Sequence, residues 1–166
     1  MLDAYFTPID ESIWAPYRDS KETMGGKLLV HGKSFPKLKK VKFVLMGAGS
    51  EADAFRKAFY RLSWRFGDLV MADLGNLVNS SDEKQNQFAM SEAMRELIEM
   101  GIHVLVIGGS EGQIYSHYKA YRQQGSPVEI VQVSPGIDLE EGTPLRQILN
   151  GRFGMNLEPM LKLRRI

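Results

Sequence analysis

A small-residue turn in the middle of the chain carries side chains that could do chemistry. Gly108, Gly109, Ser110 and Glu111 come directly after the apolar residues 104–107. The two glycines allow a sharp turn from a strand into a helix, and the first backbone N–H groups of such a helix attract an anion or a carboxylate. The alternative interpretation is structural, in which the side chain of Ser110 or Glu111 caps its own helix.

A second turn follows the apolar residues 130–133 and carries Ser134 and Asp138. The carboxyl ends of parallel strands meet at one edge of an open sheet, which is where such folds bind ligands. The carboxylates of Glu111 and Asp138 could hold one divalent cation together with water, but two carboxylates are too few for a pair of ions. The structural alternative for Asp138 is a carboxylate that caps its own loop. No nucleophile–base pair identifies a catalytic residue.

Alternating strands and helices must position these turns. Apolar runs predict four strands, at residues 41–46, 69–72, 103–107 and 128–133. Periods of 3.6 residues predict three helices, at residues 51–66, 88–100 and 113–124. This alternation indicates an α/β fold with a mostly parallel sheet and right-handed crossovers. Residues 1–40 lack a sustained period and are predicted to form an irregular arm, whereas residues 41–166 form the α/β domain.

Apolar positions also predict which helix faces are buried and where elements end. On the first helix the apolar face consists of Ala54, Phe55, Ala58, Phe59 and Leu62, and on the second it begins at Phe88. Residues 73–76 are predicted to be the turn that ends the second strand. Gly101 is placed to cap the second helix at its C-terminus. Thr143 and Pro144 predict a further helix start, and residues 160–166 an edge strand.

Composition limits the classes of function. A chain of 166 residues is long enough for one domain with a sizeable core. Its 21 basic and 20 acidic residues give a net charge of +1, which provides no electrostatic reason to expect nucleic acid or an anionic membrane as a partner. The absence of cysteine excludes disulfides and thiolate metal sites. Without a signal peptide or a long apolar run, a soluble cytoplasmic protein is expected.

The order and spacing of the two turns resemble those of the ureohydrolases, the family of arginase, agmatinase and formimidoylglutamase. That family has Gly-Gly-Asp-His-Ser where this chain has residues 108–112, and Asp-Ala-His-x-Asp where it has residues 134–138. Similarities at residues 5–8, 41–47 and 72–76 and around Arg56 extend the match. The resemblance implies a three-layer αβα fold of the arginase type. This chain would be its N-terminal part, and the domain is expected to be incomplete at its C-terminus.

The resemblance also implies which metal ligands have been replaced. The aspartate and histidine of the family's first turn fall on Ser110 and Glu111, and Ser134 takes the place of an aspartate in the second. Only Asp138 keeps a family ligand. We therefore expect a ureohydrolase-like domain that is catalytically inactive or divergent and holds no cofactor, with manganese the metal implied if one binds. Such a domain could still bind a small guanidino- or formimino-type ligand or form a homo-oligomer.

Two other functions stay open. One is a manganese-dependent hydrolase of guanidino or formimino C–N bonds, which would use Glu111 and Asp138 with ligands from elsewhere. The other is a Rossmann-like nucleotide-binding module, because residues 47–52 read Gly-Ala-Gly-Ser-Glu-Ala and Asp73 ends the next strand. Against the second stands Glu51, whose carboxylate would repel a pyrophosphate. The structural alternative for this segment is a glycine turn with Ser50 as the N-cap.

Overall fold

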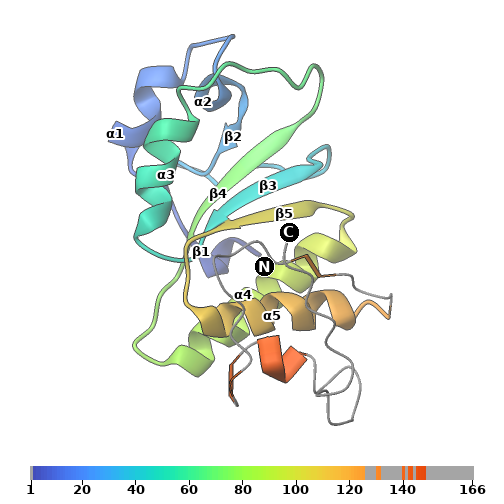
Figure 1. Cartoon of the computed structure of the whole chain (residues 1–166). Helices are drawn as coiled ribbons and strands as arrows, with labels where there is room; N and C mark the ends of the chain where they lie inside the picture. Colours follow the sequence, from blue (N-terminus) through green and yellow to red (C-terminus); the bar gives the residue numbers. More distant parts are fainter. Residues whose placement is uncertain (1, 126–129, 132–139, 141, 144, 149–166) are drawn as a thin grey trace, which may run out of the picture.

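A five-stranded mixed sheet runs through the part of the chain that the structure describes (Figure 1). In this computed structural model that part comprises residues 2–125, 130–131, 140, 142–143 and 145–148. Its strands are β1 (Phe6–Thr7), β2 (Leu29–Val30), β3 (Phe43–Gly47), β4 (Met71–Leu77) and β5 (His103–Ile107). β3 lies between β4 and β5 and is parallel to both. On its other edge β4 pairs with β2 in parallel and with β1 antiparallel.

Helices follow each of the three longer strands. They are α3 (Glu51–Phe59), α4 (Glu83–Glu99) and α5 (Glu111–Arg122). Shorter helical segments precede them, namely η1 (Leu2–Tyr5), α1 (Glu11–Trp14), η2 (Ala15–Tyr17) and α2 (Met24–Lys27). Figure 1 shows α1, α2 and α3 on one side of the sheet and α4 and α5 on the other. The molecule therefore has α/β character, with helices on both faces of a mixed sheet.

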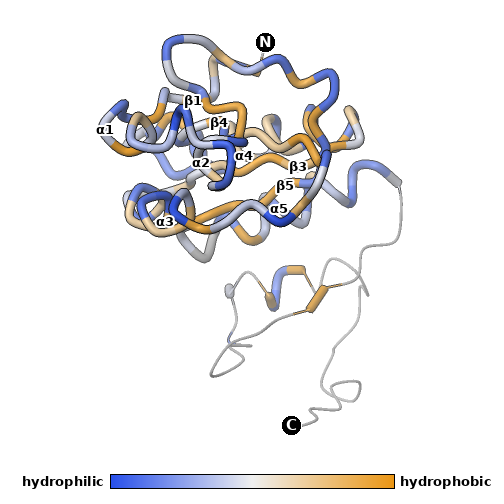
Figure 2. Tube along the Cα trace, turned by 90° about the horizontal axis from the view of Figure 1, so that it is seen from above, coloured by the Kyte–Doolittle hydropathy of each residue, from blue (hydrophilic) through white to orange (hydrophobic). Residues whose placement is uncertain are grey.

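Side-chain alternation along β4 explains how both faces are covered. Ala72 and Leu74 belong to the core that contains Met94 and Leu97 of α4, whereas Met71 packs against a second cluster around Tyr60. Successive side chains of a strand point to opposite faces, so one strand contributes to two cores. Most of β3 and β5 is apolar (Figure 2), as expected for parallel strands with helices on both faces.

The three strands and three helices predicted between residues 41 and 124 agree with the structure in type and differ at their ends. The strand predicted at residues 103–107 is β5, and Gly101 caps α4 with a φ of 71°. The prediction that residues 73–76 form a turn was wrong, because β4 continues to Leu77. Pairing with β1 extends the ladder, and Gly75 adopts a φ of 87° within the strand. The first predicted helix ends at Phe59 rather than at residue 66.

The predicted buried faces were partly wrong. In α3 the buried residues are Ala52 and Arg56, followed by Tyr60 just beyond the helix, while Ala54, Ala58 and Leu62 are exposed. These three positions follow the spacing i, i+4, i+8. The middle one can be an arginine because its guanidinium forms an ion pair with a carboxylate on β4. The α4 residue Phe88 is 64% exposed, so the core face of that helix begins two residues later, at Met90.

Residues 2–40 are more ordered than the irregular arm predicted from the sequence. They supply β1 and β2, which lie along one edge of β4. Strands of two residues have no detectable period, so only the partner strand reveals them. Among the described residues no helix is both long and apolar enough to cross a membrane. Of the predicted strand at residues 128–133 only Ile130 and Val131 are described, and the predicted strand at 160–166 lies outside the described residues.

Candidate functional site

The carboxyl ends of β3 and β5 form the position at which an open α/β sheet would bind a ligand. The two strands are neighbours, yet β3 leads into α3 on one face of the sheet and β5 leads into α5 on the other (Figure 1). In open α/β sheets, ligands bind beyond the strand ends at such a reversal. The turns at this position are residues 47–50 and residues 108–110.

These two turns touch each other through their glycines. A Cβ added to Gly49 would lie 3.2 Å from the backbone N of Gly109, and one added to Gly108 would lie 3.5 Å from the N of Gly49. Gly108 and Gly109 also have φ values of 77° and 101°, which other residues rarely adopt. The backbone N of Ala48 donates to the carbonyl of Ile107 at 2.8 Å. Glycine is therefore required here by packing and by backbone conformation.

The polar groups around the turns include carboxylates. The Oε2 atom of Glu51 is 2.7 Å from the Cβ position of Gly49 and 3.2 Å from that of Gly108, so the carboxylate lies over both turns. The hydroxyl of Ser110 donates to Oε1 of Glu83 at 3.0 Å, which joins the start of α5 to the start of α4. Negative charge at this position disfavours a bound phosphate.

Ser110 lies at the helix start where the sequence placed it. It is the N-cap of α5, and its backbone N–H donates to Oε1 of Gln113 at 3.2 Å. The backbone N–H of Gln113 in turn donates to the carbonyl of Ser110 at 3.0 Å. Ser50 also occupies an N-cap position, at the start of α3, although its side chain makes no cap hydrogen bond there.

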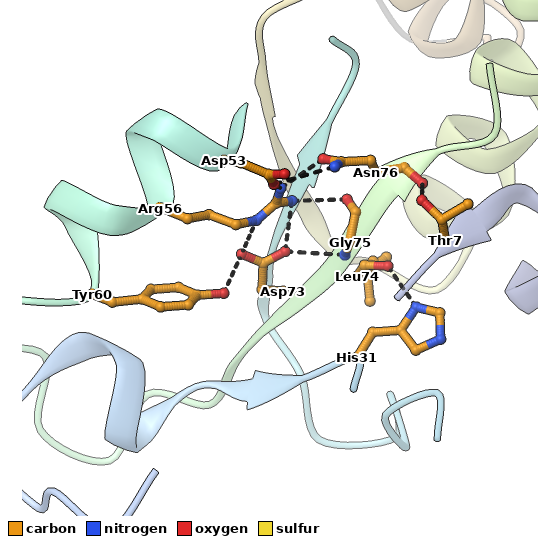
Figure 3. Close-up of polar contacts among 9 residues, drawn as sticks. All are labelled: Thr7, His31, Asp53, Arg56, Tyr60, Asp73, Leu74, Gly75 and Asn76. Carbon is orange, nitrogen blue, oxygen red and sulfur yellow. Dashed lines mark hydrogen bonds and ion pairs between the residues drawn. The ribbon is translucent and has the colours of Figure 1, made fainter. Parts of the chain in front are cut away.

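A buried polar cluster joins α3 to β4 (Figure 3). Arg56 is fully buried, and its Nε and Nη2 atoms donate to the two carboxylate oxygens of Asp73 at 2.9 and 3.0 Å. Nη2 also donates to the carbonyl of Gly75 at 2.9 Å, and Nη1 donates to Asp53 at 2.8 Å and to the side-chain oxygen of Asn76 at 2.6 Å. These contacts match the five N–H donors of a guanidinium.

The carboxylate of Asp73 is saturated as well. It accepts hydrogen bonds from the hydroxyl of Tyr60 at 2.8 Å and from the backbone N of Gly75 at 3.0 Å, in addition to the two from Arg56. Burial raises the pKa of Asp73, while the bonds from Arg56, Gly75 and Tyr60 act in the opposite direction. Burial also raises the pKa of Tyr60, so its hydroxyl stays protonated and donates. Burial alone would lower the pKa of Arg56, but Asp73 raises it above its ordinary value.

This cluster is a structural clamp rather than a binding site. Neither Arg56 nor Asp73 is accessible to solvent, and their hydrogen-bonding groups point toward each other and toward α3 and β4. Asp73 therefore cannot take the ribose-binding role that the nucleotide-binding alternative requires. Sequence reasoning missed Tyr60, although its spacing of four residues from Arg56 places both on one helix face.

His31 is a second buried polar residue that the sequence reasoning did not single out. Its Nδ1 atom lies 2.8 Å from the carbonyl oxygen of Leu74, and its ring packs edge-on against Phe35 with centroids 5.1 Å apart. Its backbone N donates to the carbonyl of Asp73, and its own carbonyl accepts from Ile9. His31 thus links the N-terminal segment to the sheet.

The candidate metal ligands are tested only in part. The structure places Gly108, Gly109 and Ser110 together at the end of β5, and the backbone of Glu111 begins α5. The side chain of Glu111 lies outside what the structure describes, as do Ser134 and Asp138, so their proposed roles stay predictions. Within the described residues, no three His, Cys, Asp or Glu residues gather in a way that could hold a metal ion.

Comparisons with known proteins point to one family. The chain is 26% identical over 118 residues to the formimidoylglutamase of Streptococcus pyogenes serotype M49 (strain NZ131), a match that covers 63% of this chain and 36% of that protein. It is 29% identical over 113 residues to the formimidoylglutamase of Salmonella heidelberg (strain SL476), covering 61% and 36%. No family model matches the chain, and no solved structure matches it.

These matches support a distant relationship to the ureohydrolases and hence a ureohydrolase-like domain. The match spans only 36% of the length of these relatives, so the activity of a whole formimidoylglutamase does not transfer to this chain.

Proposed function

We propose that this chain is a ureohydrolase-like domain of the three-layer arginase type that lacks a working dimetal centre and is not a hydrolase by itself. The observation that carries the proposal is the state of the polar residue within β4 and of the residues at the ends of β3 and β5. Asp73, the carboxylate on the central strand β4, is fully buried and bound by Arg56 and Tyr60. The ends of β3 and β5 present glycine, alanine and serine.

This observation matters because the reaction of a ureohydrolase requires metal ligands. Hydrolysis of an amidine by a ureohydrolase-type mechanism needs a metal-bound hydroxide, because free water at neutral pH is too poor a nucleophile. Two hard cations require several carboxylate or imidazole ligands at once. Ser110 can supply only a hydroxyl, and that hydroxyl already donates to Glu83. Glu111 and Asp138 would be left to hold at most one ion.

The same strand ends could retain the ligand preference of the family without its chemistry. The carboxylates of Glu51 and Glu83 lie at the rim of the two glycine turns. Negative charge there favours a positively charged guanidino or formimino group over an anion. We propose such a small cation as the ligand class.

Calorimetric titration with Mn²⁺ tests the proposal directly. We expect no binding, or weak binding that Asp138→Ala does not change. A parallel assay would follow the formation of formamide and glutamate from N-formimidoylglutamate in the presence of Mn²⁺, and we expect none above the blank. Tight binding of two ions that is lost in Asp138→Ala, or formamide release that depends on Mn²⁺, would refute the proposal and establish the alternative.

That alternative is a manganese-dependent hydrolase of guanidino or formimino C–N bonds. Its support is the name shared by the curated relatives, which are formimidoylglutamases. The nucleotide-binding alternative has less support. Asp73 is buried against Arg56, and the carboxylate of Glu51 covers the glycine turn that would have to receive the phosphates.

A further inference from the structure

The net charge of +1 conceals an uneven distribution of charge along the chain. Residues 23–50 contain six lysines and no acidic residue, whereas the rest of the chain has 15 basic and 20 acidic residues. Residues 126–166, most of which lie outside the described part, have five basic and five acidic residues, so their charges balance and leave the excess in place. Four of the six lysines lie close together in the sequence, and we call them the basic segment: Lys37, Lys39, Lys40 and Lys42.

Core packing holds the backbone of the basic segment in place. The segment reads Lys-Leu-Lys-Lys-Val-Lys, and its two apolar residues turn inward, since Val41 is 4% exposed and Leu38 packs against the same core cluster. The backbone N of Val41 donates to the carbonyl of Leu38 at 2.9 Å, which closes a tight turn with Lys39 and Lys40 at its two central positions. The lysines therefore lie on the surface while the residues between them anchor the chain.

All four lysine residues are exposed, and in the part of the chain that the structure describes none of them forms an ion pair. The basic segment precedes β3, so it lies at the opposite end of that strand from the glycine turn at residues 47–50 (Figure 1). It is therefore separate from the ligand position proposed above. Four positive charges within six residues repel one another, and a bound polyanion removes this repulsion.

We propose that the basic segment binds the phosphate backbone of a nucleic acid without reading its sequence. Lysine is a flexible, strongly hydrated point charge, which suits contacts to single phosphate groups. Phosphate contacts position a nucleic acid on a protein but carry no sequence information. Each phosphate that a lysine neutralises also releases a condensed counterion, so the four lysines add to the free energy of binding together.

Two other kinds of polyanion fit the basic segment less well. An anionic membrane is bound firmly only when a second signal, such as an inserted apolar side chain, adds to the charge, and here Leu38 and Val41 are turned into the core. An acidic peptide lacks the condensed counterions of a nucleic acid, and exposed pairs of lysine with a carboxylate contribute little free energy. The charge density of a phosphate backbone therefore favours a nucleic acid as the partner.

Fluorescence anisotropy of a labelled oligothymidylate of about 20 residues, titrated with the full chain, tests the proposal. The logarithm of the association constant should fall with the logarithm of the salt concentration with a slope of about −3, because four lysines each release about 0.7 counterions from a single strand. Lys39→Gln together with Lys40→Gln should halve this slope and weaken binding at about 50 mM salt by about fiftyfold. Lys39→Arg together with Lys40→Arg should bind like the wild type, because the charge is kept.

Lys84→Gln together with Lys119→Gln is the matched control. Both lysines are exposed, on α4 and α5, and their replacement removes the same charge outside the basic segment, so binding should change by less than about twofold. Absence of binding at about 20 mM salt, a slope near zero, or equal losses in the two glutamine variants would overturn the proposal. Equal or tighter binding to poly-glutamate or to phosphatidylserine vesicles would also overturn it, because the partner would then belong to another class.

Discussion

The ion pair between Arg56 and Asp73 gives the sharpest test of how this fold is held together. Asp73→Ala removes four hydrogen bonds at once, two of them from Arg56. The fully buried guanidinium of Arg56 then loses its buried counter-charge and keeps only its other hydrogen bonds. Breaking a buried ion pair from one side costs about 3–5 kcal/mol, because the remaining charge is left without its partner. Domains of this size are typically stable by about 5–15 kcal/mol.

Asp53 provides a matched control in the same cluster. Its carboxylate also accepts from Arg56, at 2.8 Å, but its side chain is 40% exposed, so water can replace the lost contact. Asp53→Ala should therefore cost less than about 1 kcal/mol. Both aspartates bind the same guanidinium at similar distances, but Asp73 is buried and accepts four hydrogen bonds, so the difference between the two variants measures burial together with those additional bonds.

Urea denaturation followed by circular dichroism measures both variants. With a slope of about 2 kcal/mol/M, Asp73→Ala should lower the midpoint by about 1.5–2.5 M, and Asp53→Ala by less than about 0.5 M. If Asp73→Ala does not fold, Asp73→Asn retains one acceptor oxygen and should show an intermediate loss. Equal losses in the free energy of unfolding for the two aspartate variants, or a loss below about 1 kcal/mol for Asp73→Ala, would refute the conclusion that this buried ion pair holds α3 to β4.

Two further predictions follow from burial. Met94 is fully buried in α4, so Met94→Ala should lower the free energy of unfolding, measured by urea denaturation, by about 2–5 kcal/mol. Phe88 in the same helix is 64% exposed, so Phe88→Ala should change that free energy by less than about 0.5 kcal/mol. Burial lowers the pKa of His117 from its ordinary value of 6.5. The unfolded chain therefore binds a proton that the folded chain does not, and stability should fall as the pH drops below about 6.5. His117→Gln should flatten that part of the profile, and an unchanged profile would contradict the assignment.

Several features were predictable from residue patterns because their causes are local. The strand at residues 103–107 and the glycine cap of α4 follow from an apolar run and from the conformational freedom of Gly101. The position of Ser110 at the start of α5 follows from a strand-to-helix turn with two glycines. In each case the type of side chain by itself determines the local backbone conformation.

Other features depend on partners distant in the sequence. The buried face of α3 passes through Arg56 because Asp73, 17 residues later, neutralises it, and an apolar-face rule cannot see that pairing. β1 and β2 exist because β4 offers them an edge, since two-residue strands have no period of their own. β4 likewise extends to Leu77, beyond the end predicted from the sequence, because its last residues pair with β1.

The sequence by itself determined the α/β class, the alternation of the three longer strands with their helices, and the glycine turns at the strand ends. Hydrophobic periodicity and glycine conformation are local properties, and these suffice for such elements. Only the tertiary structure decided that Asp73 is committed to a buried clamp and that the turns of β3 and β5 touch. Those outcomes depend on which side chains meet across the sheet, and burial then sets whether a carboxylate is free to bind a ligand or is held by an arginine.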